Sequence, residues 1–404
     1  MTYDPIYFTA PADSPGLDAF SRQRVSAPTL LIDVKRVGTT PDLFASNGVT
    51  GSGAAAYQVL RASTFLTVGA AVGTATRQSK VRAVYQPGKG LLHFQTFIMA
   101  PGQVNLRQRC GYFDPKNGVF LQLDGTTLGV VLRSFVSGTA VDAVVPQASW
   151  NIDPMDGSGP SGVILDITKP QILVMDLQFL GVGRVRCYFD VGGKLIPFHY
   201  FLNANAAQTS VYMSNCNLPI RWEIEATGVI AGPATLEAIC ASVNSEGGYE
   251  IAGVTASTDM GSTVEAIAGG AFEEILAIRM RSGFTEVATA FMQRASVLAA
   301  TSSSFLARLV MNPTATVPGT WANVSTNNSI MEFSVDRTVT ENTGLPLSSI
   351  YGSSSADAAG LEEKPVVTLG TDLAGVTDVY SLQVRNLSAG SEDYLGSLTW
   401  REVF

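Results

Sequence analysis

The sequence predicts an all-β protein: two antiparallel β-sandwich domains of jelly-roll-like character behind an extended N-terminal arm. Three observations carry this prediction. Apolar and polar residues alternate with a period of two along most of the chain, and turn residues recur about every ten residues. Hairpins that follow one another along the chain favour antiparallel pairing. The chain has 404 residues, more than one hydrophobic core usually holds, so we expect two domains.

Residues 1–56 are expected to form the arm and a connector. Five prolines, from Pro5 to Pro41, keep the arm extended and out of a sheet interior. Its apolar piece Thr29–Val34 could add to the edge of a sheet in this chain or in a neighbour. Residues 46–56 are rich in glycine, alanine and serine, so we expect a flexible connector there.

The first sandwich domain is expected over residues 57–250. Its clearest pattern is Ile172–Leu202, where apolar residues alternate on both sides of a Gly-Val-Gly break, and Gly192-Gly193 then forms a primed hairpin turn. The piece Pro233–Val243 fits either a helix or a strand. The other strands of this domain are expected at Gln58–Val68, Lys80–Tyr85, Leu91–Met99, Arg107–Phe113, Val119–Leu123, Leu128–Phe135, Val163–Ile167, Val211–Met213 and Ile220–Thr227.

A linker rich in glycine, serine, threonine and alanine is expected over residues 251–271, and a second β-sandwich domain over residues 272–404. Its strands are expected at Ile275–Met280, Val287–Met292, Ala295–Leu298, Phe305–Met311, Ile330–Val335, Val366–Leu369, Val379–Arg385 and Leu395–Val403.

Charge is sparse and unevenly distributed. Only 15% of the residues are charged, well below the roughly 25% usual for soluble domains, so the chain hides surface in an assembly or presents a neutral outward face. Residues 1–110 carry eleven Lys or Arg against five Asp, whereas the net charge of the whole chain is −8. A basic N-terminal part and an acidic remainder of the chain suit the docking of one chain on another. The basic residues form no run, so no nucleic-acid partner is expected.

The cysteines and the N-terminus indicate the compartment. Cys110, Cys187, Cys216 and Cys240 show no CxxC spacing, so we expect free thiols in a reducing compartment and no zinc site. The first ten residues do not have the pattern of a signal peptide. No apolar run approaches the roughly 20 residues of a membrane helix, so no membrane partner is expected.

Two groups of acidic residues could carry chemistry. Asp153, Asp156 and Ser158 lie in a loop that could hold Ca²⁺, although such residues also populate turns by bonding their own backbone. Glu223 and Glu225 lie two apart on one strand, whereas the two acids of a glycosidase usually face each other across a cleft. We therefore expect a solvated strand face there.

Histidines and tryptophans are few. His93 and His199 lie in strands among aromatic residues, so we expect packed rings rather than catalytic groups. The four tryptophans could form a sugar platform if exposed, and are otherwise core residues. They are Trp150, Trp222, Trp321 and Trp400. No cofactor is expected.

Several segments together resemble a family of structural proteins from tailed bacteriophages. These segments are Pro15–Ser26, Tyr85–Lys89, Arg107–Asp114 with Asn117-Gly118, Trp150–Asp153 with Asp156–Gly162, Leu180–Arg186 and Ser245–Tyr249. The resemblance implies a virion protein without enzymatic activity, assembled in the host cytoplasm, of the minor-capsid, decoration or head-fibre kind. It implies the major capsid protein or other virion proteins as partners, and a homo-oligomer.

The arm is the part expected to bind the particle, together with the first domain. The residues expected to make this contact are Phe20, Arg22, Arg24, Leu30 and Ile32. Two other functions stay open. One is a tail or baseplate fibre module that binds a host surface glycan, and the other is a virion-associated glycan hydrolase that uses Glu223 and Glu225.

Overall fold

The computed structural model describes residues 17–18, 20–22, 28–38, 42–206, 209–250, 253–301, 303–353, 359–362 and 368–403. The chain divides into two compact units, unit 1 over Met1–Glu250 and unit 2 over Ile251–Phe404. Helical structure in the described ranges consists of the short 3₁₀ segments Val59–Arg61, Gln147–Ser149 and Ser282–Phe284. The predicted all-β class is confirmed, and both units are β-sandwiches. No helix in these ranges is long and apolar enough to cross a membrane.

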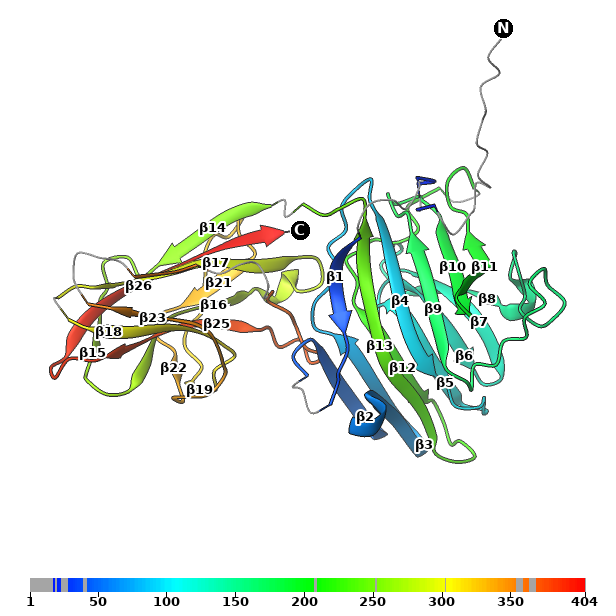
Figure 1. The fold of residues 1–404 in the computed structure, drawn as a ribbon, viewed down its shortest axis with the longest axis horizontal. Coiled ribbons are helices and arrows are strands. Elements are labelled where there is room, and N and C mark those ends of the chain that lie inside the picture. The colour runs from blue at the N-terminus through cyan, green and yellow to red at the C-terminus, as the bar shows by residue number, and fades with distance from the viewer. Residues whose placement is uncertain are drawn as a thin grey trace, which may run out of the picture. The chain divides into compact units, whose positions relative to one another are not determined.

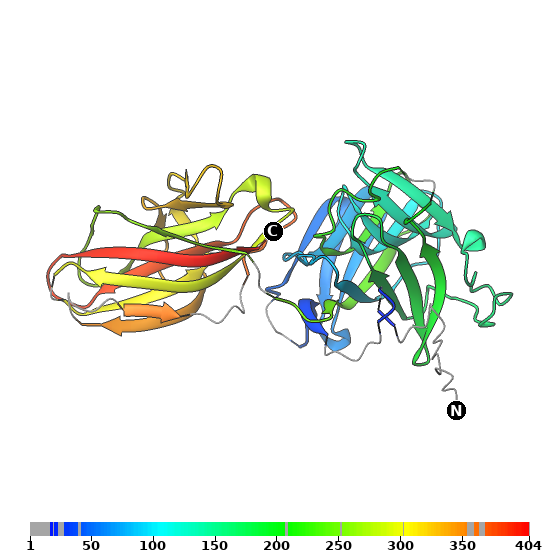
Figure 2. The same cartoon turned by 90° about the horizontal axis from the view of Figure 1, so that it is seen from above.

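Unit 1 holds thirteen strands joined in one curled antiparallel sheet (Figure 1). Their order is β11-β10-β9-β4-β13-β3-β12-β5-β6-β7-β8, with β1 paired to β13 and β2 to β3. The strands are β1 Thr29–Val34, β2 Ala45–Gln58, β3 Ser63–Ser79, β4 Gly90–Ile98, β5 Leu106–Phe113, β6 Gly118–Asp124, β7 Thr127–Ser134, β8 Val141–Pro146, β9 Gln171–Leu177, β10 Val185–Val191, β11 Lys194–Phe201, β12 Ile220–Ala226 and β13 Ala234–Glu246. Seen from above, they curl around a common interior (Figure 2).

Two long strands, β2 and β3, connect the two layers of the curled sheet. The first half of β3, Thr64–Val68, pairs with β13, and its second half, Gly73–Gln78, pairs with β12. The neighbouring β2 follows β3 through both halves, with a bulge between Gly51 and Gly53. One layer contains β13 and its neighbour β4, and the other contains β12 and its neighbour β5. Because β2 and β3 run through both layers, the sandwich is one continuous sheet folded over on itself.

The core of unit 1 lies between the two layers. Trp222 of β12 donates a hydrogen bond from its indole Nε1 to the backbone oxygen of Thr96 of β4, at 3.2 Å, from one layer to the other. The ring of Tyr112 on β5 lies 6.1 Å from that of His93 on β4. Large buried rings therefore fill the space between the layers, and they account for much of the apolar area removed from water.

The passage of β2 and β3 between the layers depends on glycine. A Cβ atom on Gly53 would lie 2.0 Å from the backbone oxygen of Thr74, and one on Gly73 would lie 2.4 Å from the backbone nitrogen of Ser52. Gly51 has a φ of +55°, which favours glycine. The prediction of a flexible connector over 46–56 is therefore wrong, because these glycines permit close backbone approach inside a strand.

The hairpin prediction is confirmed. Strand β10 pairs with β9 on one side and with β11 on the other. The pair Val191 and Lys194 closes the two-residue turn, in which Gly192 and Gly193 have φ values of +62° and +79°. Positive φ at both positions is what a type I′ turn requires. The ambiguous piece Pro233–Val243 lies almost wholly in β13, a strand.

The N-terminal arm is shorter than predicted. Strand β1 pairs with β13 of the same chain, and its Ile32 and Val34 are buried in the core of unit 1. Of the two partners left open for Thr29–Val34, the sheet of this chain is the one observed, so these residues belong to unit 1 rather than to a free arm. Strand β8 was not predicted. The predicted strands Lys80–Tyr85, Val163–Ile167 and Val211–Met213 are irregular segments apart from a bridge at Ile164.

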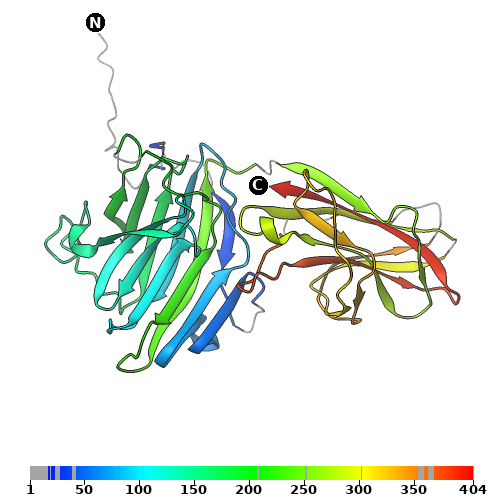
Figure 3. The same ribbon diagram turned by 180° about the vertical axis from the view of Figure 1, so that it is seen from behind.

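Unit 2 is a smaller sandwich, seen from behind in Figure 3. One sheet has the order β14-β26-β17-β24 with β15 on β26, the other has β20-β21-β16-β25-β18-β23, and β19 pairs with β22. Ile278 and Leu382 from one sheet share a buried cluster with Leu398 and Trp400 from the other. The strands are β14 Val254–Asp259, β15 Glu265–Ile267, β16 Phe272–Met280, β17 Thr289–Ala299, β18 Phe305–Met311, β19 Ala315–Val317, β20 Ala322–Asn323, β21 Met331–Ser334, β22 Thr338–Val339, β23 Leu345–Gly352, β24 Ala359–Glu362, β25 Val379–Asn386 and β26 Glu392–Val403.

The predicted linker over residues 251–271 contains two strands of unit 2. Both β14 and β15 pair with β26. The linker prediction is wrong for these strands, since small polar residues also suit an exposed edge strand such as β14. The strand predicted at Val366–Leu369 lies partly outside the described residues.

Candidate functional site

The acids considered for hydrolysis lie in a network of ion pairs on unit 1. Glu223 of β12 accepts hydrogen bonds from Arg109 of β5 at 2.6 Å and from Arg221 of its own strand at 3.1 Å. Glu225 accepts from Arg107 at 2.9 Å. Glu223 is only 6% exposed, so the expected solvated strand face is wrong for this residue. Alternation placed both acids on one face, but it could not show that arginines from β5 pair with them.

This network holds the Glu223 carboxylate in its ionised form. Burial alone would raise the pKa of Glu223, but Arg221 and Arg109 outweigh burial and lower the pKa to about 2. A general acid in a glycosidase must carry a proton near neutral pH. The two arginines favour the ionised form of Glu223, which suits a structural role.

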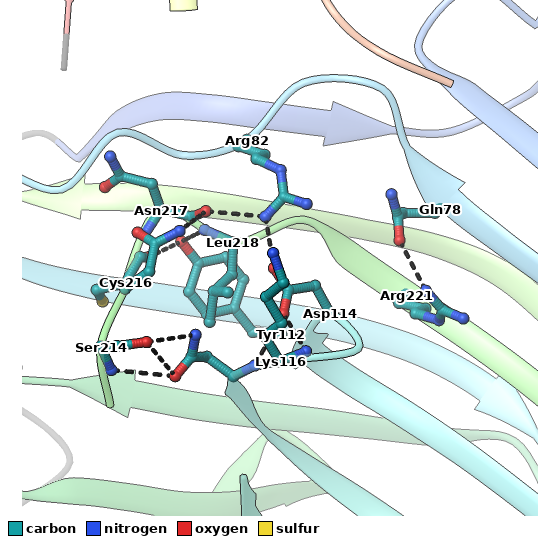
Figure 4. Close-up of polar contacts among 12 residues, drawn as sticks. Gln78, Arg82, Tyr112, Asp114, Lys116, Ser214, Cys216, Asn217, Leu218 and Arg221 are labelled. Carbon is teal, nitrogen blue, oxygen red and sulfur yellow. Dashed lines mark hydrogen bonds and ion pairs between the residues drawn. The ribbon is translucent and has the colours of Figure 1, made fainter. Parts of the chain in front are cut away.

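A second polar network fixes the end of the β5–β6 hairpin (Figure 4). Asp114 accepts hydrogen bonds from the Arg82 side chain at 2.8 Å and from the backbone nitrogen of Lys116 at 2.7 Å. The Tyr112 hydroxyl donates to the backbone oxygen of Cys216 at 2.7 Å and accepts from the backbone nitrogen of Leu218 at 3.1 Å. These bonds tie the hairpin to the irregular segment before β12, so this network stabilises the fold.

Both histidines are packed as expected. His199 accepts a hydrogen bond at Nδ1 from the backbone nitrogen of Asn151, at 3.3 Å. His93 is fully buried, and neither of its ring nitrogens has a hydrogen-bond partner among the described residues. Burial lowers the pKa of His93 to about 3 and that of His199 to about 4. Neither ring is placed to exchange protons with a substrate.

His93 gives unit 1 a predictable sensitivity to acid. Its pKa in the folded state is about 3, below the usual 6.5, so the unfolded chain binds the extra proton first. Stability is therefore full above pH 6.5 and falls as the pH drops towards 3. We expect the His93 contribution to lower the free energy of unfolding by about 2 kcal/mol at pH 5. Urea unfolding at pH 7 and pH 5 measures this loss.

The matched variant is His93→Leu, which cannot titrate. It should unfold at a urea concentration no lower than that of the wild type at pH 7, because it removes two buried nitrogens that lack partners. Its loss between pH 7 and pH 5 should be smaller by about 2 kcal/mol. Equal losses in the two proteins would contradict the assignment to His93.

The candidate calcium loop uses its oxygens internally. Asp153 accepts hydrogen bonds from the backbone nitrogens of Met155 and Ser161, both at 2.8 Å. Asp156 accepts from the backbone nitrogen of Ser158 at 2.9 Å and from its hydroxyl at 2.5 Å. The turn interpretation therefore describes this loop. Across the described ranges, no group of three or more His, Cys, Asp or Glu side chains is arranged to hold a metal ion.

The predicted particle-binding residues are divided between two settings. Arg22 pairs with the buried Asp18 at 2.6 Å and lies over the ring of Phe20, so this part of the arm is folded. On β1, Leu30 is exposed but Ile32 is buried in the core of unit 1. Ile32 cannot contact a particle, which corrects that prediction. Arg24 lies outside the described residues.

Three of the four tryptophans are core residues, and the fourth lines a cavity. Trp150, Trp222 and Trp400 are buried. Trp321 in unit 2 lines a cavity of about 550 Å³ and is half-buried. The sequence signals available for this site were the Trp itself and the preceding turn Pro318-Gly319, but the residues facing them come from strands far along the chain.

All four cysteines are free thiols, as predicted. Cys110, Cys187 and Cys216 are buried and Cys240 is exposed. Burial raises the pKa of each of the three buried thiols, so they stay protonated and unreactive in the folded protein.

No family model and no curated protein matches the chain. Among solved structures, a β-glucanase from Bacillus licheniformis is similar at 10% identity and a TM-score of 0.32, over 52% of this chain and 97% of that one. A legume lectin-like domain from Entamoeba histolytica is similar at 10% identity and a TM-score of 0.30, over 52% and 95%. A protein of unknown function from Shewanella oneidensis MR-1 is similar at 10% identity and a TM-score of 0.35, over 55% of this chain and 89% of that one. With TM-scores below 0.5, these likenesses carry no argument about what this chain does.

Proposed function

We propose that this chain is a non-enzymatic structural protein of a tailed-phage particle, of the capsid-decoration, minor-capsid or head-fibre kind. It binds the particle through its N-terminal residues and unit 1. One observation carries the proposal: segments on which the phage resemblance rests, far apart in the sequence, contact one another in unit 1. The resemblance therefore concerns a connected framework rather than scattered matches.

Two contacts illustrate this framework. Arg186 of β10 donates a hydrogen bond to the backbone oxygen of Leu17 at 2.7 Å, which ties the arm to the sheet. The backbone nitrogen of Leu180 donates to the Tyr85 hydroxyl at 3.3 Å. Leu17 of the inner arm is thus tied to unit 1, and residues 1–16 are the segment proposed to reach a neighbouring subunit.

An apolar patch at one end of unit 1 supports a contact surface on this unit. Val104 and Val229 are each 76% exposed, and Val72 is 61% exposed. Val104 and Val229 lie in loops and Val72 lies in β3, and hydrogen bonds link these segments: the Asn105 side chain donates to the backbone oxygen of Val229 at 2.9 Å, and the backbone nitrogen of Ile230 donates to that of Ala70 at 3.0 Å. Exposed apolar side chains gathered in this way often mark a protein–protein contact.

Removal of residues 1–16 tests the arm, and Val229→Glu tests the patch. We expect each change to lower the copy number per purified particle by about tenfold, the equivalent of about 1.4 kcal/mol of binding. Quantitative mass spectrometry against the major capsid protein measures it. The deletion stops before Leu17, because Leu17 and the later residues Ile32, Val34 and Ala45 are buried in unit 1.

The charge-matched control is Val335→Glu, at an exposed valine of unit 2. It should leave the copy number unchanged. If the shortened chain enters particles as well as the full chain does, the role of the arm is wrong. If the full chain is absent from purified particles, the virion proposal itself is wrong.

A further inference from the structure

We propose that the Trp321 cavity of unit 2 binds a neutral sugar residue of a surface glycan. The inference goes beyond the structural role proposed above and does not depend on it. The cavity lies on the six-stranded sheet, where Arg279, Glu332 and Val379 from three adjacent strands line its floor. Pro318, Trp321 and Val376 line it from the segments around the sheet.

The segment that carries Trp321 is held firmly against the sheet. The backbone nitrogen of Thr320 donates to the Asp336 carboxylate at 2.7 Å, and the Trp321 indole donates to the backbone oxygen of Pro318 at 3.2 Å. A Cβ atom on Gly319 would lie 2.5 Å from the Ser334 hydroxyl, so the backbone approaches the sheet closely there. The ring is therefore positioned before any ligand arrives, which lowers the entropic cost of binding.

Trp321, Arg279 and Glu332 form one ordered unit. The guanidinium of Arg279 lies 4.0 Å from the centre of the Trp321 ring, and its Nε donates to the Glu332 carboxylate at 2.5 Å. The ion pair fixes the guanidinium and the guanidinium fixes the ring. Because the guanidinium lies over the ring, Arg279 covers one face of the indole, and a sugar would pack on the other face and reach the Arg279–Glu332 pair at the ring edge. The remaining lining of the site is largely apolar.

The charges of the cavity favour a neutral ligand. Arg279 is paired with Glu332, and the other lining arginine, Arg337, is paired at 2.7 Å with the buried Glu274. Among the described residues that line the cavity, neither arginine is left without a counter-charge to attract a phosphate or a carboxylate. An arginine beside a carboxylate offers donors and acceptors side by side, which matches vicinal hydroxyl groups, since each hydroxyl both donates and accepts.

The size and the wall chemistry fit a sugar. A volume of about 550 Å³ lies within the range of ligand sites and accommodates one or two sugar rings. The C–H face of a pyranose is apolar and packs on an indole ring, while its hydroxyl groups face outward to polar partners. Trp321 with Pro318 and Val376 supplies the apolar wall, and the Arg279–Glu332 pair supplies the polar one.

The test uses the full chain on an array of neutral and anionic oligosaccharides, followed by titration with the best neutral ligand. The wild type should bind neutral glycans, and Trp321→Ala should lose affinity by about tenfold or more. Tyr351→Ala is the matched control, because Tyr351 is an exposed aromatic residue of the same unit outside the cavity. It should bind as the wild type does.

A second measurement needs no variant. Trp321 is the most exposed of the four tryptophans, so acrylamide should quench its fluorescence first, and the bound neutral sugar should protect it. The proposal is overturned if the wild type binds no neutral glycan, if it binds anionic glycans only, or if Trp321→Ala binds as well as Tyr351→Ala does. Particle copy number is a separate readout, so this proposal and the structural role can fail independently.

Discussion

Replacing Gly53 by alanine is expected to destabilise unit 1 by about 3–5 kcal/mol, a large share of the stability of an ordinary domain. The new Cβ atom would lie 2.0 Å from the backbone oxygen of Thr74. Thr74 is paired with Thr50 of β2, so β2 and β3 must separate there to relieve the clash. Because β2 and β3 belong to both layers, the damage should spread through the whole sandwich.

The control is Gly232→Ala, in a loop of the same unit. A Cβ atom on Gly232 meets no atom within 4 Å. It should change stability by less than about 1 kcal/mol, and a small gain is expected because alanine restricts the unfolded chain. Hydrogen exchange of peptides from β12 and β13 in the full-length protein reports unit 1 directly. Equal protection in the two variants would refute the role assigned to Gly53.

Replacing Asp176 by alanine is expected to cost about 3–5 kcal/mol, because it leaves the Arg186 guanidinium buried without its counter-charge. Both side chains of this ion pair are 0% exposed. The same guanidinium also donates to Leu17, so the inner arm should loosen when Arg186 moves. Denaturant unfolding measures the first effect, and hydrogen exchange of the peptide that contains Leu17 measures the second.

Two further variants separate the lost charge partner from lost packing. The double variant Asp176→Leu with Arg186→Met should recover most of the loss, since a buried pair can often be exchanged for apolar side chains at little cost. Lys35→Ala removes an exposed ion pair with Asp33 and should cost less than about 1 kcal/mol. If the double variant is as unstable as Asp176→Ala alone, the loss does not come from the unpaired charge.

The local pattern of the chain predicts much of the fold. The alternation around Gly192-Gly193 was sufficient because a type I′ hairpin is specified by residues that are neighbours in sequence. The same reasoning failed for residues 46–56, since glycine that permits close strand contact looks like glycine that makes a linker flexible. For Thr29–Val34 the sequence left two sheet partners open, because an apolar strand does not reveal which sheet edge it joins.

The candidate site could not be predicted to the same degree. Glu223 and Arg109 lie on strands more than a hundred residues apart in the sequence. The lowered pKa of the Glu223 carboxylate depends in part on this pairing, so the sequence could not predict it. Trp321 could be named from the sequence as a sugar platform, but Arg279 and Glu332 could not be assigned to it. Their meeting depends on the order of strands in the second sheet of unit 2.

The three buried thiols and the one exposed thiol allow local unfolding of unit 1 to be followed by thiol labelling. A maleimide reagent should modify the exposed Cys240 at once and leave Cys110, Cys187 and Cys216 untouched. Slow labelling of those three would then time the rate at which β5, β10 and the segment before β12 become accessible. Each thiol marks a different part of unit 1, so mass spectrometry of the modified peptides would show which region yields first.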